Sequence, residues 1–280
     1  MSGLAKELTP KLLDFARKAG SFAVAKQQGL SHELKSDNSL VTQTDKAVSE
    51  MAKETFAEYF AQDNHFLVDE EFIGDTTPNE VFDKHEYIWV LDPIDGTVPY
   101  ANKRWEYGIL LGILKDGEPF LSVMYMPVFE ELIWFDGEHV WQDNPSLGTP
   151  EKLTVTRQVM GHICLEVDDK QHTKIGDFKD AGMWANSPEA SIGAWVHVAL
   201  NRSDGYVAAG WHKIWDVAAG WVICHALNIP VIEANQGRPL TKLAADDFAA
   251  NWAIKGRWVA ARQEIQDDIM KVLKSRQEAA

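Results

Sequence analysis

Asp92-Pro93-Ile94-Asp95-Gly96-Thr97 directly follows the apolar run Tyr87-Ile88-Trp89-Val90-Leu91, and this junction is the most informative part of the chain. The apolar run is typical of a buried strand, so two carboxylates stand three positions apart where the strand ends. The proline fixes one backbone angle, and the glycine permits a turn. Two carboxylates ~5 Å apart at an effective dielectric of ~20 repel by ~3 kcal/mol. A hard cation such as Mg²⁺ reverses that repulsion. An ordinary acidic turn is the alternative for this hexapeptide alone.

Acidic residues stand at element boundaries in three other regions of the sequence. Glu70-Glu71 follows the apolar run Phe66-Leu67-Val68, and Asp216 opens an apolar segment with a helical pattern. Asp45 precedes another helical pattern, and Asp216 is expected at a helix N-cap. A cap or a solvated acid is the simpler explanation for each one separately. The combination favours a shared acidic site.

These acidic motifs resemble the signatures of the inositol monophosphatase family, in the family's order and at similar spacing. The resemblance covers roughly Leu4 to Leu240. The segments that carry it are Val41-Thr42-Gln43-Thr44-Asp45, Glu70-Glu71, Asp92-Pro93-Ile94-Asp95-Gly96-Thr97 and Trp215-Asp216-Val217-Ala218-Ala219-Gly220. It implies a layered sandwich of alternating helices and sheets, of α+β or α/β class.

The sequence predicts two subdomains, residues 1–153 and 154–280, that do not fold independently. The first carries most of the acids and should contain two helices, over about 4–30 and 45–60, beside an antiparallel meander. Asp116-Gly117 and Asp136-Gly137 are turn signals between alternating apolar segments, so they predict two hairpins. Their strands are expected at 109–114, 120–126, 131–135 and 139–141.

The second subdomain alternates strands with helices, which predicts a partly parallel sheet. Ser187-Pro188-Glu189 has the pattern of an N-cap, a first-turn proline and a first-turn acid, so a helix is expected from there to about Asn201. Further helices are expected over 216–227 and 264–274. Strands are expected over 206–209, 231–233 and 258–261.

Composition excludes several classes of protein. The 280-residue chain is 45% hydrophobic and has a formal net charge of −15, which disfavours nucleic acid as a partner. It has no apolar run approaching the ~20 residues of a membrane span and no signal-peptide pattern at its start, so we expect no membrane partner. Free thiols are expected for Cys164 and Cys224, which fits a cytoplasmic protein.

The family resemblance implies a metal-dependent site with two or three Mg²⁺ ions. Glu70, Asp92 and the Ile94 carbonyl would hold one ion, and Asp92, Asp95 and Asp216 a second. Glu70 and Thr97 would position the attacking water. Asp45 would support this network from behind or hold a weaker third ion. The amides of Gly96 and Thr97 would meet the phosphate if a helix begins there.

Several neighbouring residues leave alternatives open. A one-residue slip would move the ligand from Glu70 to Asp69, and Glu71 has no assigned role. Lys35 is either a surface charge or a lysine near the site, as family members often have.

The segments that would face the leaving group depart from the family pattern. Inositol-cleaving members carry a Glu about seven residues before the Asp216 position. In this chain the corresponding segment has no acid and is one residue longer than in the family. Trp211 and His212, with Lys213, are the substitutes expected in the leaving-group pocket. Core packing of Trp211 and solvent exposure of Lys213 are the alternatives. Glu189 is similar to the acid of histidinol-phosphate phosphatases, although it also suits an ordinary first turn.

The predicted function is Mg²⁺-dependent hydrolysis of a small phosphorylated polyol or metabolite by two-metal activation of water. Histidinol phosphate and adenosine 3′,5′-bisphosphate are alternative substrates. A non-catalytic metal-binding partner protein is the alternative of another class. The resemblance also implies lithium sensitivity and, since many relatives are dimers, a homodimer.

Overall fold

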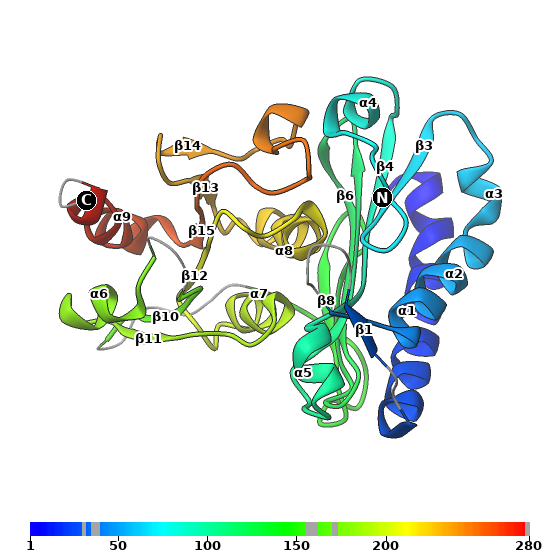
Figure 1. Cartoon of the computed structure of the whole chain (residues 1–280), viewed down its shortest axis with the longest axis horizontal. Coiled ribbons are helices and arrows are strands. Elements are labelled where there is room, and N and C mark those ends of the chain that lie inside the picture. Colours follow the sequence, from blue (N-terminus) through cyan, green and yellow to red (C-terminus); the bar gives the residue numbers. More distant parts are fainter. Residues whose placement is uncertain (30–31, 35–39, 155–161, 170–172, 278–280) are drawn as a thin grey trace.

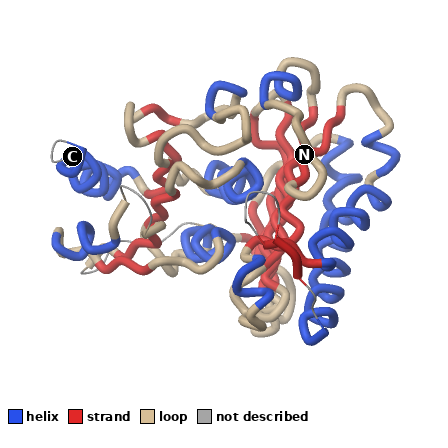
Figure 2. The backbone as a smooth tube through the Cα atoms, in the orientation of Figure 1, coloured by secondary structure: helices blue, strands red, loops and turns tan. Residues whose placement is uncertain are grey.

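The computed structural model describes residues 1–29, 32–34, 40–154, 162–169 and 173–277. Its elements form alternating layers of helix and sheet, and Figure 1 shows them nearly edge-on. One layer of helices lies at each outer face, and a third lies between the two sheets, as the tube in Figure 2 also shows. The layered sandwich expected from the sequence is therefore confirmed.

The N-terminal helices pack together against one face of the first sheet. α1 (Gly3–Lys26) is capped by the Ser2 side chain, which accepts from the Ala5 amide at 3.1 Å. η1 (Gln27–Gly29) continues it as a 3₁₀ turn. α2 (Gln43–Thr55) and α3 (Ala57–Phe60) replace the single helix expected over 45–60, because the chain leaves helical geometry at Phe56. The buried Phe56 ring packs into the core there.

The first sheet has seven strands within the described residues. They are β3 (His65–Asp69), β4 (Tyr87–Asp95), β5 (Gly108–Lys115), β6 (Glu118–Met126), β7 (Glu131–Phe135), β8 (Val140–Asp143) and β9 (Glu151–Lys152), paired in that order. β3 and β4 are parallel, and the later pairs are antiparallel, so both predicted hairpins are confirmed. β1 (His32–Leu34) and β2 (Leu40–Thr42) form a separate ribbon. Short helices α4 (Pro78–Phe82) and α5 (Thr97–Ala101) flank β4.

β4 continues through Asp95, so the strand end expected at Leu91 is wrong. Asp92 pairs with Leu110 and Asp95 pairs with Gly108, which leaves one extra residue on β4. The resulting bulge accommodates Pro93, which has no N–H for the ladder. Strict alternation would place Asp92 and Asp95 on opposite faces of the sheet. The extra residue changes the alternation and turns both carboxylates to one side.

The second sheet has six strands in the described part of the chain, in the order β11, β10, β12, β15, β13, β14. β10 is parallel to β11 and β12, and the other pairs are antiparallel, as expected for a partly parallel sheet. The strands are β10 (Cys164–Val167), β11 (Trp184–Asn186), β12 (Gly205–Ala208), β13 (Val231–Glu233), β14 (Arg238–Pro239) and β15 (Trp258–Ala261). The remaining elements are α6 (Ile175–Asp180), α7 (Ser191–Ala199), α8 (Ile214–Ala226), η2 (Ala245–Asp247) and α9 (Gln263–Gln277).

Two helix starts differ from the sequence expectation. α7 begins at Ser191 rather than beside Ser187, because the first residues of the helix bond to Asp95 instead of continuing a local cap. Asp216 is the third residue of α8 rather than its N-cap. Its carboxylate accepts from the amide of Lys213, the capping position, at 2.6 Å.

α7 and α8 form the middle layer, and their close contact joins the two sheets in one hydrophobic core. Residues of β4 to β7 pack with residues of both helices and of β12. The proposed division at residue 153 falls between β9 and β10, and we retain it as a proposal. Cys164 and Cys224 are free, as expected. No helix in the described ranges is long and apolar enough to span a membrane.

The contact between the two middle helices gives a test of this packing. A Cβ added to Gly220 of α8 would lie 2.0 Å from the Trp195 ring of α7, whereas a Cβ at Gly193 of α7 meets nothing within 4 Å. We expect Gly220→Ala to lower the free energy of unfolding by about 1–3 kcal/mol through overpacking. Gly193→Ala should be neutral or stabilise by up to about 1 kcal/mol. Urea unfolding of both variants checks this, and equal effects would contradict the described packing.

Candidate active site

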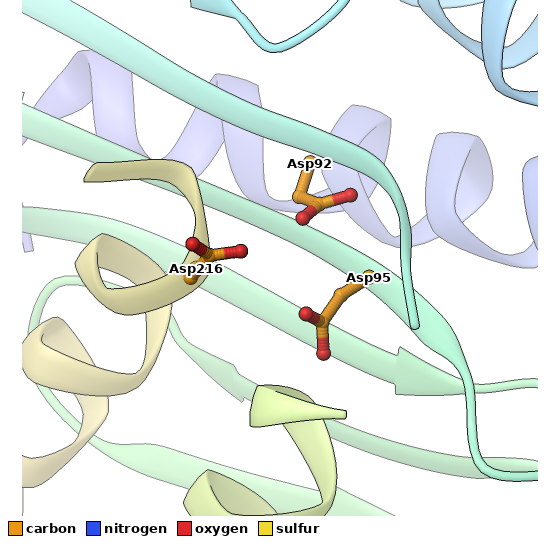
Figure 3. Close-up of side chains that lie close together, drawn as sticks. All are labelled: Asp92, Asp95 and Asp216. Carbon is orange, nitrogen blue, oxygen red and sulfur yellow. The ribbon is translucent and has the colours of Figure 1, made fainter. Parts of the chain in front are cut away.

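Three carboxylates from two distant parts of the sequence converge in the folded chain (Figure 3). Asp92 and Asp95 come from the bulged end of β4, and Asp216 comes from the first turn of α8. One oxygen of each lies within 4.8 Å of the others. Asp92 is 1% exposed and Asp95 is 5% exposed. The β4 bulge and the start of α8 therefore create a compact set of oxygen donors.

Hydrogen bonds from α7 fix one of these carboxylates and tie it to α8. The Ser191 hydroxyl lies 2.9 Å from Asp95 Oδ1 and 2.9 Å from the Asp216 carbonyl oxygen, as donor to either acceptor. The Ile192 amide donates to Asp95 Oδ2 at 2.5 Å. On β4, the Ile94 amide donates to Asp92 Oδ1 at 3.0 Å. The sequence indicates no role for Ser191, because the helix was expected to begin beside Ser187 and the contact of Ser191 with Asp95 joins residues far apart in the chain.

Burial and the charges of neighbouring carboxylates make Asp92 and Asp95 harder to ionise. Burial raises the pKa of Asp92 well above its usual range, and the charges of Glu70, Asp95 and Asp216 raise it further. Burial followed by the Asp216 charge raises the pKa of Asp95 to about 7, although its bonds from Ile192 and Ser191 oppose the shift. A divalent cation bound between the carboxylates would relieve this repulsion.

The carboxylates border a cavity of about 670 Å³. Its wall includes these residues expected from the sequence: Glu70, Asp92, Ile94, Asp95, Gly96, Thr97, Glu189, Trp211, His212 and Asp216. It also includes Val98, Pro99, Asn102 and Arg104, which were not expected, and the neighbours of Glu189 in its segment, Pro188, Ala190 and Ser191. The cavity has the size of a small-molecule site.

Asp45 lies behind this wall and supports Thr97. The Thr97 hydroxyl is 3.2 Å from Asp45 Oδ1 and 3.1 Å from the Ile94 carbonyl oxygen. The other Asp45 oxygen accepts from the amide and the hydroxyl of Thr42, which completes the cap of α2. Burial raises the pKa of Asp45, against the effect of these hydrogen bonds. Asp45 is therefore a buried residue that contacts the site through the Thr97 hydroxyl.

Gly96 has a backbone conformation that only glycine adopts easily, with φ of +87°. A Cβ there would lie 2.7 Å from both the Glu106 carbonyl oxygen and the Ala190 Cβ. α5 then begins at Thr97, so the expected helix start is confirmed. The glycine therefore lets β4, α5 and the chain before α7 approach one another.

Strand alternation distinguishes the neighbouring acids at the end of β3. Asp69 is 1% exposed and accepts from the Ser49 hydroxyl at 2.9 Å and from the Glu71 amide at 2.8 Å. Its side chain thus faces α2, whereas Glu70 borders the cavity. The structure favours Glu70 over Asp69 as the site residue. Glu71 is not part of the cavity wall, and Lys35 lies outside the described residues.

The expected leaving-group residues occupy different environments. Glu189 forms an ion pair with Arg104 across the cavity wall, and Arg104 also lies 3.8 Å from Glu106. Trp211 is 36% exposed, and its ring stacks on that of His212 at a centroid distance of 4.0 Å. His212 borders the cavity but is only 3% exposed, with its ring between Asp168 and Asp216.

A second cavity of about 630 Å³ adjoins the first. It lies between the segment after β3 and the start of α8, and it shares Glu70, Trp211 and Asp216 with the first cavity. Lys213 borders it, and its Nζ donates to the Asn251 carbonyl oxygen at 2.9 Å.

A layered α/β fold with carboxylates converging at a strand bulge and a helix start is an arrangement that suits a hydrolase dependent on divalent cations. The profile of the inositol monophosphatase family matches residues 5–267. The chain belongs to the inositol monophosphatase family, and it is accordingly a phosphatase that hydrolyses phosphate monoesters.

Curated relatives agree with this assignment, and a solved structure agrees with the fold. The chain is 27% identical to the inositol-1-monophosphatase ImpA of Mycolicibacterium smegmatis over 254 residues, 86% of this chain and 82% of ImpA. It is 22% identical to the 3′(2′),5′-bisphosphate nucleotidase CysQ of Buchnera aphidicola over 78% of this chain and 81% of CysQ. An IMPase/NADP phosphatase complexed with Mg²⁺ and phosphate superposes with a TM-score of 0.76 at 16% identity, covering 96% of this chain and 95% of that one.

The raised pKa of Asp95 predicts a pH-dependent stability of the metal-free protein. An unfolded Asp has a pKa of about 3.9, and the folded value is about 7. Between these values the folded chain binds more protons than the unfolded chain, so stability falls as pH rises. Asp95→Asn should make the decrease of the unfolding free energy with pH less steep, by up to about 1.4 kcal/mol per pH unit. Urea unfolding from pH 4 to pH 8 with a chelator checks it, and an unchanged slope would contradict the assignment.

Proposed function

We propose that this protein is a Mg²⁺-dependent phosphomonoesterase that hydrolyses a small phosphorylated metabolite with two metal ions. The observation that carries the proposal is the convergence of Asp92, Asp95 and Asp216 within 4.8 Å beside a cavity that Glu70 and Thr97 also border. The Mg²⁺ and phosphate complex of the similar structure supports the choice of ion.

The donor set suits hard divalent ions. Glu70, Asp92 and the Ile94 carbonyl would hold one ion, and Asp92, Asp95 and Asp216 the second. Ile94 can serve although Thr97 contacts its carbonyl, because a carbonyl oxygen has two lone pairs. Two such ions would neutralise the phosphate and lower the pKa of water. Asp45 supports this arrangement through Thr97.

Glu70 and Thr97 would orient the attacking water. The Thr97 hydroxyl has one proton, which it can donate to Asp45 or to the Ile94 carbonyl. Its oxygen therefore keeps a lone pair that can accept a hydrogen bond from water. The Glu70 carboxylate can accept the second proton as general base. The amides of Gly96 and Thr97 would then face the phosphate oxygens.

The other side of the cavity would contact the leaving group through Glu189, Trp211 and Arg104. Because Arg104 already pairs with Glu189, a cationic group such as that of histidinol phosphate would have to displace it. A second phosphate could instead bind Arg104 directly. This cation favours a nucleoside 3′,5′-bisphosphate as the second candidate substrate, beside a polyol phosphate. A homodimer stays a prediction.

A pair of neighbouring acids tests the proposed chemistry. Glu70→Gln should lower kcat by about 10²–10⁴-fold, the usual contribution of a general base. Glu71→Gln is the matched control, since Glu71 lies outside the cavity wall, and it should keep wild-type turnover. The measurement is Mg²⁺-dependent phosphate release from a panel of inositol, sugar, histidinol and nucleoside phosphates. Full turnover by Glu70→Gln would refute the mechanism.

The same panel tests the role of Arg104. Arg104→Ala should raise KM for a nucleoside bisphosphate by about 10–100-fold, because a charged hydrogen bond contributes about 1.5–3 kcal/mol. KM for a polyol monophosphate should change little. Lys103→Gln is the control, since this neighbouring cation does not border the cavity. An equal change for both esters would exclude Arg104 as a contact for a second phosphate.

A further inference from the structure

His212 is buried between carboxylates from two separate elements. Its Nε2 lies 2.6 Å from Oδ2 of Asp168, the residue that follows β10. Its Nδ1 lies 3.3 Å from Oδ2 of Asp216, in the first turn of α8. The residue is 3% exposed, which leaves little of it for a substrate to contact. The substrate-binding role expected from the sequence therefore does not suit this geometry.

Asp168 holds the His212 imidazole and is itself held by further hydrogen bonds. Its Oδ2 also accepts from the Tyr206 hydroxyl at 3.0 Å and from the Ala209 amide at 2.8 Å. Asp168 is 5% exposed and Tyr206 is fully buried. Because these donors come from β12 and the segment that follows it, the position of Asp168 is set by the second sheet. Asp168 thus links that sheet to His212.

The ring orientation follows from its neighbours. Trp211 stacks on the ring with an interplanar angle of 29°, and the Tyr206 ring meets it edge-on at 73°. With Nε2 held by Asp168 and the ring plane fixed, Nδ1 faces Asp216. The 3.3 Å approach is not aligned as a hydrogen bond, and Nδ1 has no other hydrogen-bond partner among the described residues. Because a buried polar atom without a hydrogen-bond partner is unfavourable, this nitrogen favours closer contact with Asp216.

Two groups thus act on the same oxygen of Asp216. The Lys213 amide donates to Oδ2 at 2.6 Å, and His212 approaches that oxygen from the ring side. Neither contact uses Oδ1. Both contacts restrict rotation of the carboxylate while it faces Asp92 and Asp95.

We propose that Asp168 and His212 are positioning residues that hold Asp216 toward the divalent-ion site and so set its metal affinity. The inference rests on the proposed function, because it needs Asp216 to bind the ion. Partners that orient a metal ligand typically change metal affinity by about 10–100-fold when they are removed. The roles proposed for Glu70, Thr97 and the residues that would contact the leaving group do not depend on this inference.

Two amide substitutions of His212 separate its two contacts. The Asn amide nitrogen is nearest in position to Nδ1, so His212→Asn keeps a donor toward Asp216 and loses the link to Asp168. The Gln amide nitrogen is nearest to Nε2, so His212→Gln keeps the link to Asp168 and loses the donor toward Asp216. Both variants carry the same amide group, and the one additional methylene of Gln decides which carboxylate the amide nitrogen reaches.

The experiment measures Mg²⁺ affinity by titration calorimetry of the full chain without substrate, followed by the Mg²⁺ dependence and KM of phosphate release. We expect His212→Gln to weaken Mg²⁺ binding by about 10–100-fold while KM at saturating Mg²⁺ stays near wild type. His212→Asn should retain more of the affinity than His212→Gln. Wild-type Mg²⁺ affinity in His212→Gln would overturn the proposal. So would a raised KM with unchanged Mg²⁺ affinity, which would mark His212 as a substrate contact.

A milder variant keeps the test valid if His212 substitutions prevent folding. Tyr206→Phe removes only the hydroxyl, which donates to Asp168 and lies 2.9 Å from His212 Nε2, so it should weaken Mg²⁺ binding by a few-fold in a folded protein. Unchanged affinity in a folded Tyr206→Phe, with no folded His212 variant, would count against the proposal. Failure of the proposed function is distinct, because the wild-type chain itself would then show no Mg²⁺ binding and no Mg²⁺-dependent phosphate release.

Discussion

The extra residue in β4 is the constraint on which the site depends. Without it, alternation would turn Asp95 away from Asp92, toward the outer helices. With it, both carboxylates face the middle helix layer, where Asp216 completes the set. Their repulsion is tolerated because the start of α7 places two hydrogen-bond donors, the Ile192 amide and the Ser191 hydroxyl, beside Asp95. Local backbone geometry and long-range packing therefore act together to concentrate negative charge.

The middle helix layer connects the carboxylates of the site to both sheets. α7 and α8 pack closely enough that Gly220 lies against the Trp195 ring, and the Trp195 indole donates to the Asp216 carbonyl at 2.9 Å. Behind the site, Asp168 and His212 connect the second sheet to the first turn of α8. The carboxylates of the site are thus held by contacts from both sheets. A rigid support of this kind suits chemistry that depends on fixed donor positions.

Much of the fold followed from local patterns. The hairpins at Asp116-Gly117 and Asp136-Gly137 were predictable because turn chemistry and alternation are short-range. The helix break at Phe56, the extension of β4 and the start of α7 were not. Each depends on a partner distant in sequence: the aromatic core around Phe56, the ladder with β5, and the bonds to Asp95. Tertiary contacts of this kind override local propensity.

The sequence by itself determined the family, the alternation of the layers and the acidic residue types that gather at the site. Only the tertiary structure decided which of those residues face the cavity. Phe66 and Val68 pack toward the middle helices while Leu67 packs toward the outer ones, so Glu70 reaches the cavity and Asp69 reaches Ser49. The tertiary structure also buries His212 and places Arg104 in an ion pair with Glu189. The physical reason is that a one-residue difference in register reverses the face of a strand, and motif spacing does not record the partners that fix this register.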